Sequence, residues 1–306
     1  MSSAQSPLIS VDWGTSSFRA FLASPNGAVI DSVENDRGIL TVDAGEHERI
    51  LADAVGAWRG KSALPIVMSG MIGARQGWVE APYAACPGGL REVALAMIAI
   101  PTNTLGEVFV VPGMSAIDSH GAPDVMRGEE TQIFGALAAS GDADGLFVLP
   151  GTHSKWARVA AGRITGFATY MTGEVFAVLK NHSILGRLMA EGDDLGEGFD
   201  EGVRAAARLE RPGDLLHAIF MTRTLGLFDR LGAAKLADYL SGLLIGAEIS
   251  AAAHGATTAT VVGSPRLTAR YRHAGASLGV TFTPAPDHCS LLGQLALLRA
   301  RNGIAA

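Results

Sequence analysis

Two short segments of the chain share a Gly-Thr-x-Ser pattern, at residues 14–17 and 151–154, and each follows an apolar run. A turn of small polar residues between two strands directs consecutive N–H groups and hydroxyls toward one point, which creates an anion-sized concavity. The first segment also carries a carboxylate, Asp12, at the end of its apolar run. A carboxylate beside a phosphate repels it unless a cation lies between them. The first segment therefore predicts Mg²⁺, held by Asp12, together with a nucleotide.

The first segment alone also fits an ordinary hairpin whose turn contains Asp and Gly. The second copy favours phosphate binding, because two equivalent turns near the starts of two half-chains predict two similar lobes facing a nucleotide. Arg19 would offset the charge that develops on a transferred phosphoryl group. The residues expected to contact phosphates are Gly14, Thr15 and Ser16 in the first turn, and Gly151 and Thr152 in the second.

Two adjacent glutamates stand at the start of a predicted helix. Gly128 is expected to cap this helix, with Glu129 and Glu130 in its first turn and an apolar run from Ile133 onward. Acids at this position usually complement the helix dipole. Because the helix ends shortly before the second phosphate segment, one of the two is expected to act as a general base toward an acceptor hydroxyl. The residues leave open which glutamate it is, and we favour Glu129.

Residues 74–83 form a candidate sugar-binding loop, because Arg75, Gln76 and Trp78 combine hydrogen-bonding groups with an aromatic ring. A surface loop with its aromatic side chains packed beneath it is the alternative. A sugar acid would also need a cation for its carboxylate, and a guanidinium suits a bidentate grip. Arg75 and Arg127 are the two candidates for that role.

Composition excludes several classes of partner. The chain has 306 residues, of which 48% are hydrophobic, enough for two domains with substantial cores. A net charge of −6 without a basic block argues against nucleic acid and an anionic membrane surface as partners. No apolar run approaches membrane-spanning length, and two cysteines are too few for a disulfide framework. We therefore expect a cytoplasmic protein.

The elements that position these groups alternate between strands and helices, which predicts an α/β fold. We expect an N-terminal lobe over residues 1–142, with the first hairpin and the sugar-binding loop, and a C-terminal lobe over residues 143–306, with the second hairpin. In the second lobe, a strand, glycine turn and helix over residues 259–271 would bring Gly263 and Ser264 to an adenosine. Residues 114–125 and 193–201 are expected to be loops, and residues 289–301 a helix that closes the second lobe.

The order of these motifs resembles that of the FGGY-type carbohydrate kinases of the actin/hexokinase superfamily. Residues 12–19 and 150–152 are similar to the two phosphate motifs, residues 127–132 to the helix that carries the catalytic base, and residues 262–264 to the adenosine motif. More specifically, the chain resembles the 2-dehydro-3-deoxygalactonokinase family over nearly its whole length. The stretches that carry this resemblance are residues 11–15, 126–132, 150–156, 181–183, 241–248 and 267–271.

This resemblance implies a two-lobed actin-like ATPase (ribonuclease H-like) fold, with a mixed sheet flanked by helices in each lobe and a cleft between the lobes. It implies ATP and Mg²⁺ as cofactors and phosphorylation of 2-dehydro-3-deoxy-D-galactonate at its terminal 6-hydroxyl in galactonate degradation. The chain departs from the FGGY pattern in having two glutamates where those kinases place an aspartate. The galacto configuration of the substrate rests on the resemblance alone.

Two other functions remain compatible with the same residues. One is a kinase for another small sugar or sugar acid, and the other is a non-catalytic sensor of a sugar or nucleotide on the same fold. A sensor needs no base, so Asp12 and the two glutamates favour a kinase.

Overall fold

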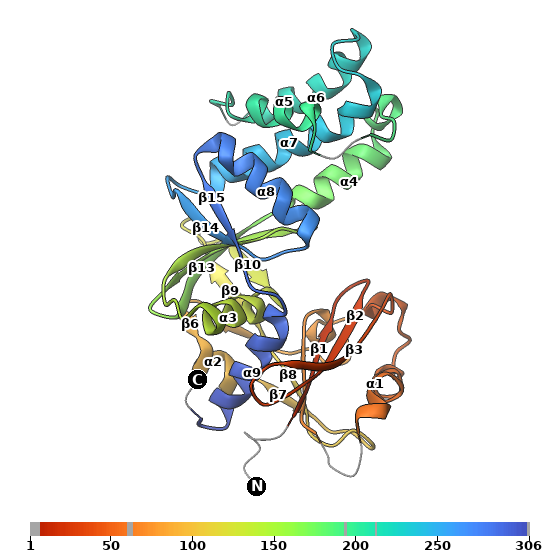
Figure 1. Cartoon of the computed structure of the whole chain (residues 1–306), viewed down its shortest axis with the longest axis vertical. Coiled ribbons are helices and arrows are strands. Elements are labelled where there is room, and N and C mark those ends of the chain that lie inside the picture. The colour runs from red at the N-terminus through yellow and green to blue at the C-terminus, as the bar shows by residue number, and fades with distance from the viewer. Residues whose placement is uncertain (1–6, 60–63, 193–194, 212, 305–306) are drawn as a thin grey trace. The chain divides into compact units, whose positions relative to one another are not determined.

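The computed structural model describes residues 7–59, 64–192, 195–211 and 213–304 (Figure 1). The chain divides into two compact units. Unit 1 comprises Met1–Gly145, Arg158–Phe167 and Pro286–Ala306, and unit 2 comprises Leu146–Ala157 and Ala168–Ala285. This division differs from the single boundary expected after residue 142, because the chain returns to unit 1 twice.

Unit 1 is built on a mixed six-stranded sheet in the order β3-β2-β1-β4-β8-β7. The central strand β1 pairs antiparallel with β2 and parallel with β4. Its side chains are almost all buried, as expected for an apolar strand in the middle of a mixed sheet. The strands are β1 Leu8–Trp13, β2 Phe18–Ala23, β3 Val29–Asn35, β4 Ile66–Ser69, β7 Ile98–Ile100 and β8 Val108–Val110. The helices α1 (His47–Val55) and α2 (Leu90–Leu95) also belong to this unit.

A second, three-stranded sheet in unit 1 has the order β10-β9-β5, with β5 Tyr83–Ala85, β9 Gly113–Ile117 and β10 Pro123–Met126. The expected irregular loop over residues 114–125 is therefore wrong, since most of it is an antiparallel hairpin. Asp118 forms the turn, because its carboxylate accepts from the N–H groups of His120 and Ala122 at 2.8 Å. Asp118 thus has a structural role in a turn, which its sequence neighbourhood did not reveal.

Helix α9 (Cys289–Arg301) packs on α3 (Glu129–Ser140) inside unit 1 rather than closing the second lobe. A Cβ atom on Gly135 would lie 1.9 Å from the Cys289 carbonyl oxygen, and one on Gly293 would lie 1.9 Å from that of Thr131. The two helices can approach this closely only because both positions lack a side chain. Gln294 then fixes α9 to β1, since its side chain accepts from Val11 N at 3.1 Å and donates to Val11 O at 2.8 Å.

The third sheet has the order β15-β14-β11-β12-β13-β6. The strands are β6 Gly88–Gly89, β11 Gly145–Leu149, β12 Ser154–Ala160, β13 Arg163–Tyr170, β14 Thr258–Val261 and β15 Thr281–Pro284. Residues 158–167, at the tip of the β12–β13 hairpin, group with unit 1, as does β6. The expected strand, glycine turn and helix over residues 259–271 is confirmed by β14 and α8 (Pro265–Leu278).

The remaining helices of unit 2 are α4 (Thr172–His182), α5 (Glu197–Ala206), α6 (Asp214–Leu227) and α7 (Ala233–Ala252). Helix α5 replaces most of the loop expected over residues 193–201, of which 193–194 lie outside the described residues. Its Phe199 is fully buried against α7, where Gly242 leaves room for the Phe199 carbonyl. Across the described parts of the chain, no helix is both long and apolar enough to cross a membrane.

Candidate active site

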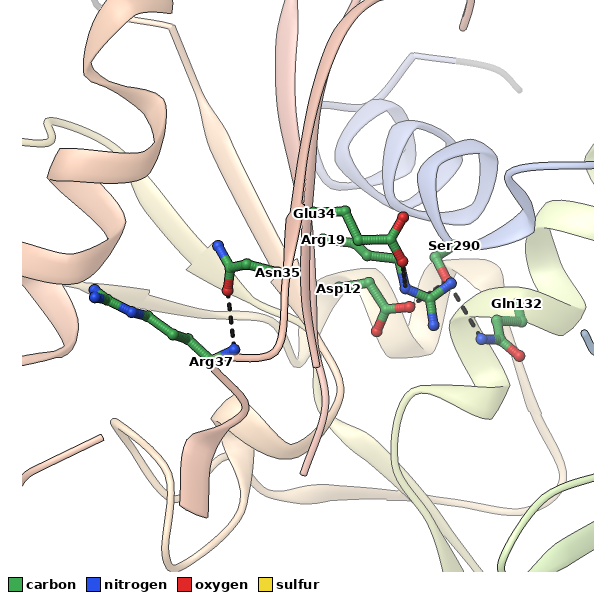
Figure 2. Close-up of polar contacts among 7 residues, drawn as sticks. All are labelled: Asp12, Arg19, Glu34, Asn35, Arg37, Gln132 and Ser290. Carbon is green, nitrogen blue, oxygen red and sulfur yellow. Dashed lines mark hydrogen bonds and ion pairs between the residues drawn. The ribbon is translucent and has the colours of Figure 1, made fainter. Parts of the chain in front are cut away.

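Asp12 is the penultimate residue of β1 in unit 1, two residues before the first Gly-Thr-x-Ser turn. Burial raises the pKa of its carboxyl group, whereas the charge of Arg19 and a hydrogen bond from Ser290 lower it. The Ser290 hydroxyl donates to Asp12 Oδ2 at 3.3 Å (Figure 2). A poorly solvated carboxylate with so few donors is stabilised by a bound cation, so this side chain fits a Mg²⁺ ligand.

A chain of polar contacts connects Asp12 to helix α3. Gln132 donates to Ser290 Oγ at 3.3 Å, and Ser290 in turn donates to Asp12 (Figure 2). Arg19 is paired with Asp12 in the β1–β2 ladder, and its side chain lies on the same face, with Nε 3.5 Å from Glu34 Oε1 of β3 (Figure 2). Arg19 is half-exposed, so its guanidinium remains accessible to an anion at this end of the sheet.

The first turn, residues 14–17, is closed by a hydrogen bond from Gly14 N to Ser17 O of 2.9 Å. Gly38 packs directly behind it, and a Cβ atom there would lie 2.3 Å from Ser16 N. The side chains of Thr15 and Ser16 are exposed, as a ligand-binding turn requires. The sequence placed these residues at the turn but gave no indication of the support from Gly38.

Two glycines bring the start of α3 close to Asp12. Gly70, after β4, has φ +91°, and a Cβ atom on it would lie 3.4 Å from Asp12 Oδ1. Gly128, at the N-cap of α3, has φ +105°, and its Cβ atom would lie 3.1 Å from Gly70 Cα. Both positions favour glycine because of the positive φ angle and the close backbone approach. The first turn of α3 and Asp12 therefore belong to one site in unit 1.

The two glutamates at the start of α3 differ sharply in environment. Glu130 is fully buried, and it accepts from Gly128 N and the Thr131 hydroxyl, both at 2.8 Å. Burial, reinforced by the nearby charge of Glu129, raises the pKa of Glu130 to about 8. Glu129 is only half-buried, and it accepts from Arg127 N at 2.8 Å. Of the two side chains, Glu129 is therefore the one that a ligand can reach.

Arg127 is the better placed of the two candidate arginines. Its guanidinium stacks on Tyr83, 4.3 Å from the ring centroid, and its Nη2 donates to Ala81 O at 2.9 Å. Its Nη1 is buried and has no hydrogen-bond partner among the residues that the structure describes. By contrast, the Arg75 side chain is 82% exposed and lies 3.4 Å from Glu80. A buried guanidinium with a free donor requires an acceptor, and a carboxylate supplies one.

The other two residues of the sugar-binding loop have different surroundings. Gln76 is exposed. Trp78 is half-buried and stacks on His47, with ring centroids 6.1 Å apart and an interplanar angle of 12°. Burial lowers the pKa of His47, whose Nε2 is buried and has no partner among the described residues. Trp78 thus packs on the core of unit 1, as the alternative interpretation of the loop expected.

In unit 2, the second turn connects β11 to β12 and lies against the start of α4. Gly173 leaves room for it, since a Cβ atom there would lie 2.3 Å from Gly151 O. Glu174 N donates to Thr152 O at 3.0 Å, and the Glu174 side chain pairs with His153 at the tip of the turn. Gly151 and Thr152 are thus held by backbone contacts to α4.

A buried polar network beneath this turn was not predicted. Glu248 of α7 accepts from Trp156 Nε1 at 2.7 Å and from the Tyr271 hydroxyl at 2.8 Å. Tyr271 is also bonded to Ser154, the last residue of the turn, at 3.1 Å. Burial raises the pKa of Glu248 and, together with the charge of Glu248, that of Tyr271. The available signal was a carboxylate that follows the apolar run of residues 243–247 in the helix.

A cavity of about 540 Å³ opens beside the second turn, between α4, α7 and α8 of unit 2. Its lining includes Gly151 and Gly173 at the turn, and Arg266 and Leu267 from α8. Ser264 is the N-cap of α8, with its hydroxyl accepting from Leu267 N at 3.4 Å, and Gly263 precedes it. The predicted adenosine motif therefore begins the helix whose first turn lines this cavity.

The chain matches a family model described as 2-keto-3-deoxy-galactonokinase over residues 12–297. It is 40% identical over 274 residues to a Rhizobium meliloti (strain 1021) protein named as a probable 2-dehydro-3-deoxygalactonokinase, DgoK1, and the match covers 88% of this chain and 89% of that protein. It is 32% identical over 281 residues to the 2-dehydro-3-deoxygalactonokinase of Escherichia coli (strain K12), covering 90% and 91% of the two chains.

A crystal structure from Sinorhizobium meliloti, described as that of a "putative 2-dehydro-3-deoxygalactonokinase protein", superposes with a TM-score of 0.87 at 37% identity. The superposition covers 96% of this chain and 98% of that chain. The relatives are thus similar to this chain over nearly its whole length and in fold.

Proposed function

Because the chain belongs to the 2-keto-3-deoxy-galactonokinase family, we propose that it transfers the γ-phosphoryl group of ATP to the terminal 6-hydroxyl of 2-dehydro-3-deoxy-D-galactonate. The observation that carries the proposal is the family match over residues 12–297, which includes both turns and the acid-bearing helix. The chain is an α/β enzyme with the actin-like ATPase fold of this family, and it acts in galactonate catabolism. The proposal assigns it to the cytoplasm, where its nucleotide is available.

Mg²⁺ would be held by Asp12, whose half-buried carboxylate accepts one hydrogen bond from Ser290. When bound, the ion would neutralise phosphate charge and orient the nucleotide. The residues around Asp12 keep its carboxylate in place through the contacts of Ser290 and Gln132. The exposed hydroxyls of Thr15 and Ser16 and the N–H groups of their turn bind phosphate oxygens, and Arg19 supplies positive charge at the same end of the sheet.

Glu129 accepts the proton of the attacking hydroxyl. Its side chain is half-buried in the first turn of α3, next to Gly128, which packs on Gly70 beside Asp12. Glu130 supports it from within: fully buried, it accepts from the N–H group of Gly128 and so stabilises the bend before the helix. With a pKa of about 8, Glu130 is mostly neutral near pH 7 and leaves the negative charge to its neighbour.

Arg127 binds the carboxylate of the sugar acid. A hydroxyl of a neutral sugar could also accept from the buried Nη1 donor, but the carboxylate of a sugar acid gives the guanidinium a charged acceptor and therefore a stronger hydrogen bond. Gly151 and Thr152 bind phosphates from unit 2, and the cavity beside them receives the nucleoside. This division of tasks agrees with the positions of Asp12 and Arg19, which flank the first turn but have no charged counterparts at the matching positions of the second.

A kinase for a different sugar acid is the second candidate, because Arg127 would bind any carboxylate of similar reach. A coupled assay of ADP release against a panel of 2-keto-3-deoxy sugar acids, aldonic acids and neutral sugars distinguishes the candidates. We expect the highest kcat/KM with 2-dehydro-3-deoxy-D-galactonate. Faster turnover of another acid would change the substrate, and no ADP release with any acceptor would contradict the kinase assignment and favour a sensor.

A further inference from the structure

The cavity of unit 2 contains a polar pair that none of the motifs accounts for. Asp238 and Ser241 lie three residues apart on one face of α7, so their side chains are neighbours on the helix surface. Both line the cavity, and both are held by one guanidinium. Arg270 Nη2 donates to Asp238 Oδ1 at 2.7 Å, and its Nη1 donates to Ser241 Oγ at 2.6 Å.

Arg270 is itself fixed, so the pair is preorganised. Its side chain is 7% exposed and stacks on Phe199, 5.2 Å from the ring centroid. Because Arg270 occupies Oδ1 of Asp238, the second carboxylate oxygen has no partner among the described residues and remains an acceptor. Because Ser241 accepts from Arg270, its hydroxyl proton remains available for donation. The cavity wall thus presents one acceptor and one donor side by side.

A vicinal diol matches this pair, since one of its hydroxyls can donate to the carboxylate while the other accepts from the serine. The position along α7 agrees with a ribose. Glu248, which anchors the second phosphate turn, is ten residues beyond Asp238 on α7, a separation of about 15 Å at the helical rise. A nucleotide whose phosphates lie at that turn would bring its sugar toward Asp238.

Small residues lie beyond Asp238, at the end of the cavity away from the turn. Ala234 and Ala237 line it from α7, and Ala190 and Gly192 line it from the segment before α5. Gly192 touches the start of α7, because a Cβ atom there would lie 1.7 Å from Ala234 O. Side chains this small leave space for a planar base past the sugar.

We propose that Asp238 and Ser241, oriented by Arg270, recognise the 2′,3′-diol of the nucleotide and make the enzyme select ribonucleotides over deoxyribonucleotides. The assignment rests on the proposed use of ATP, and it identifies the ribose as the part of the nucleotide that these unit 2 side chains recognise. A base edge is the competing ligand for the same donor and acceptor, and it is an outcome of the test below.

Calorimetry without sugar acid tests the assignment independently of turnover, with ADP, 2′-deoxy-ADP, 3′-deoxy-ADP and inosine diphosphate as ligands. Wild-type protein should bind ADP roughly 10-fold or more tightly than at least one deoxy analogue, the loss expected for a charge-assisted hydrogen bond. Asp238→Asn should bring ADP and that analogue to within about 2-fold of each other, while affinity for the analogue changes little. Ser241→Ala, which keeps the ion pair intact, should likewise reduce the preference.

Glu191→Gln is the matched control, because Glu191 lines the same cavity and should affect ADP and its deoxy analogues alike. Melting curves identify variants that fail to fold, and Ser241→Ala then decides. Equal wild-type affinity for ADP and both deoxy analogues would overturn the assignment. So would variants that change only the ratio of ADP to inosine diphosphate, because the pair would then read the base. Ribose selection without kinase activity would support this assignment and contradict the proposed function.

Discussion

The first Gly-Thr-x-Ser turn follows Asp12 and precedes Arg19, whereas the second has Leu149 and Trp156 at the matching positions. The first turn is buttressed by the backbone at Gly38, with charged side chains on both sides. The second is supported by α4 and by the buried Glu248 network, in which Trp156 is a donor. The same local pattern thus serves two purposes. We propose that the first copy, flanked by Asp12 and Arg19, holds the transferred phosphoryl group and its metal, and that the second copy holds the rest of the nucleotide.

The largest expected effect comes from removing the charge that only the first turn has. Asp12→Asn should lower kcat by roughly 10³-fold, because the metal loses its anchoring charge, with a much smaller change in nucleotide affinity. Steady-state kinetics at saturating Mg²⁺, together with calorimetry of ADP binding, measures both quantities. Turnover near the wild-type rate would show that the two turns do not differ in this way.

Replacing Arg127 should act on the acceptor rather than the nucleotide. Arg127→Ala should raise KM for the sugar acid, since losing a buried charge-assisted pair costs about 2–5 kcal/mol. Arg75→Ala is the matched control, and its exposed side chain should change KM by less than about 2-fold. The contrary result, a larger effect from Arg75→Ala, would mean that the carboxylate binds at the loop instead.

A change beneath the second turn should weaken nucleotide binding and leave chemistry largely intact. Glu248→Gln retains the shape but offers Trp156 and Tyr271 a poorer acceptor, so we expect KM for ATP to rise by about 10-fold. The kcat at saturating ATP should fall much less. A reduction of kcat alone, with KM for ATP unchanged, would contradict the assignment of this turn to nucleotide binding.

The effect expected to be smallest on activity is instead one on stability, and it depends on pH. The pKa of Glu130 is about 8 in the folded protein against 4.5 for an ordinary glutamate. Above pH 4.5 the unfolded chain ionises first, so this residue lowers the free energy of unfolding progressively up to about pH 8, by at most about 1.4 kcal/mol per pH unit. Glu130→Gln mimics the neutral acid and should remove that loss. In urea unfolding at pH 5, 6.5 and 8, the free energy of unfolding of the variant relative to wild type should increase as pH rises. A difference that does not depend on pH would refute the explanation.

The local elements around the site could be predicted because their signals are local. The hairpin of β1 and β2 follows from apolar runs around a small-residue turn, and α3 begins where Gly128 predicts it. Long-range placement could not be predicted in the same way. The sequence of an apolar helix such as α9 does not indicate which sheet the helix will pack on. The contact that fixes α9, between Gln294 and Val11, joins residues 283 positions apart in the sequence.

Which members of a motif face a ligand was also beyond the sequence. Adjacent helical residues point about 100° apart, so only one of Glu129 and Glu130 was expected to reach the site. That Glu130 is the buried one depends on tertiary packing around Gly128 and Thr131. Likewise, Asp238 and Ser241 are oriented by hydrogen bonds from Arg270, which belongs to a different helix and could not be linked to them from the sequence.

The central claim is that the charged end of unit 1 performs the chemistry, with Glu129 as the base. The most direct test is kcat for Glu129→Gln beside Glu130→Gln, each with a melting curve. Glu129→Gln should lose roughly 10²–10⁴-fold in kcat, because the amide cannot accept the hydroxyl proton. Glu130→Gln should stay within about 3-fold of wild type near pH 7, because it replaces a mostly neutral acid by an amide of the same shape. Wild-type turnover by Glu129→Gln, or a loss confined to Glu130→Gln, would contradict the account.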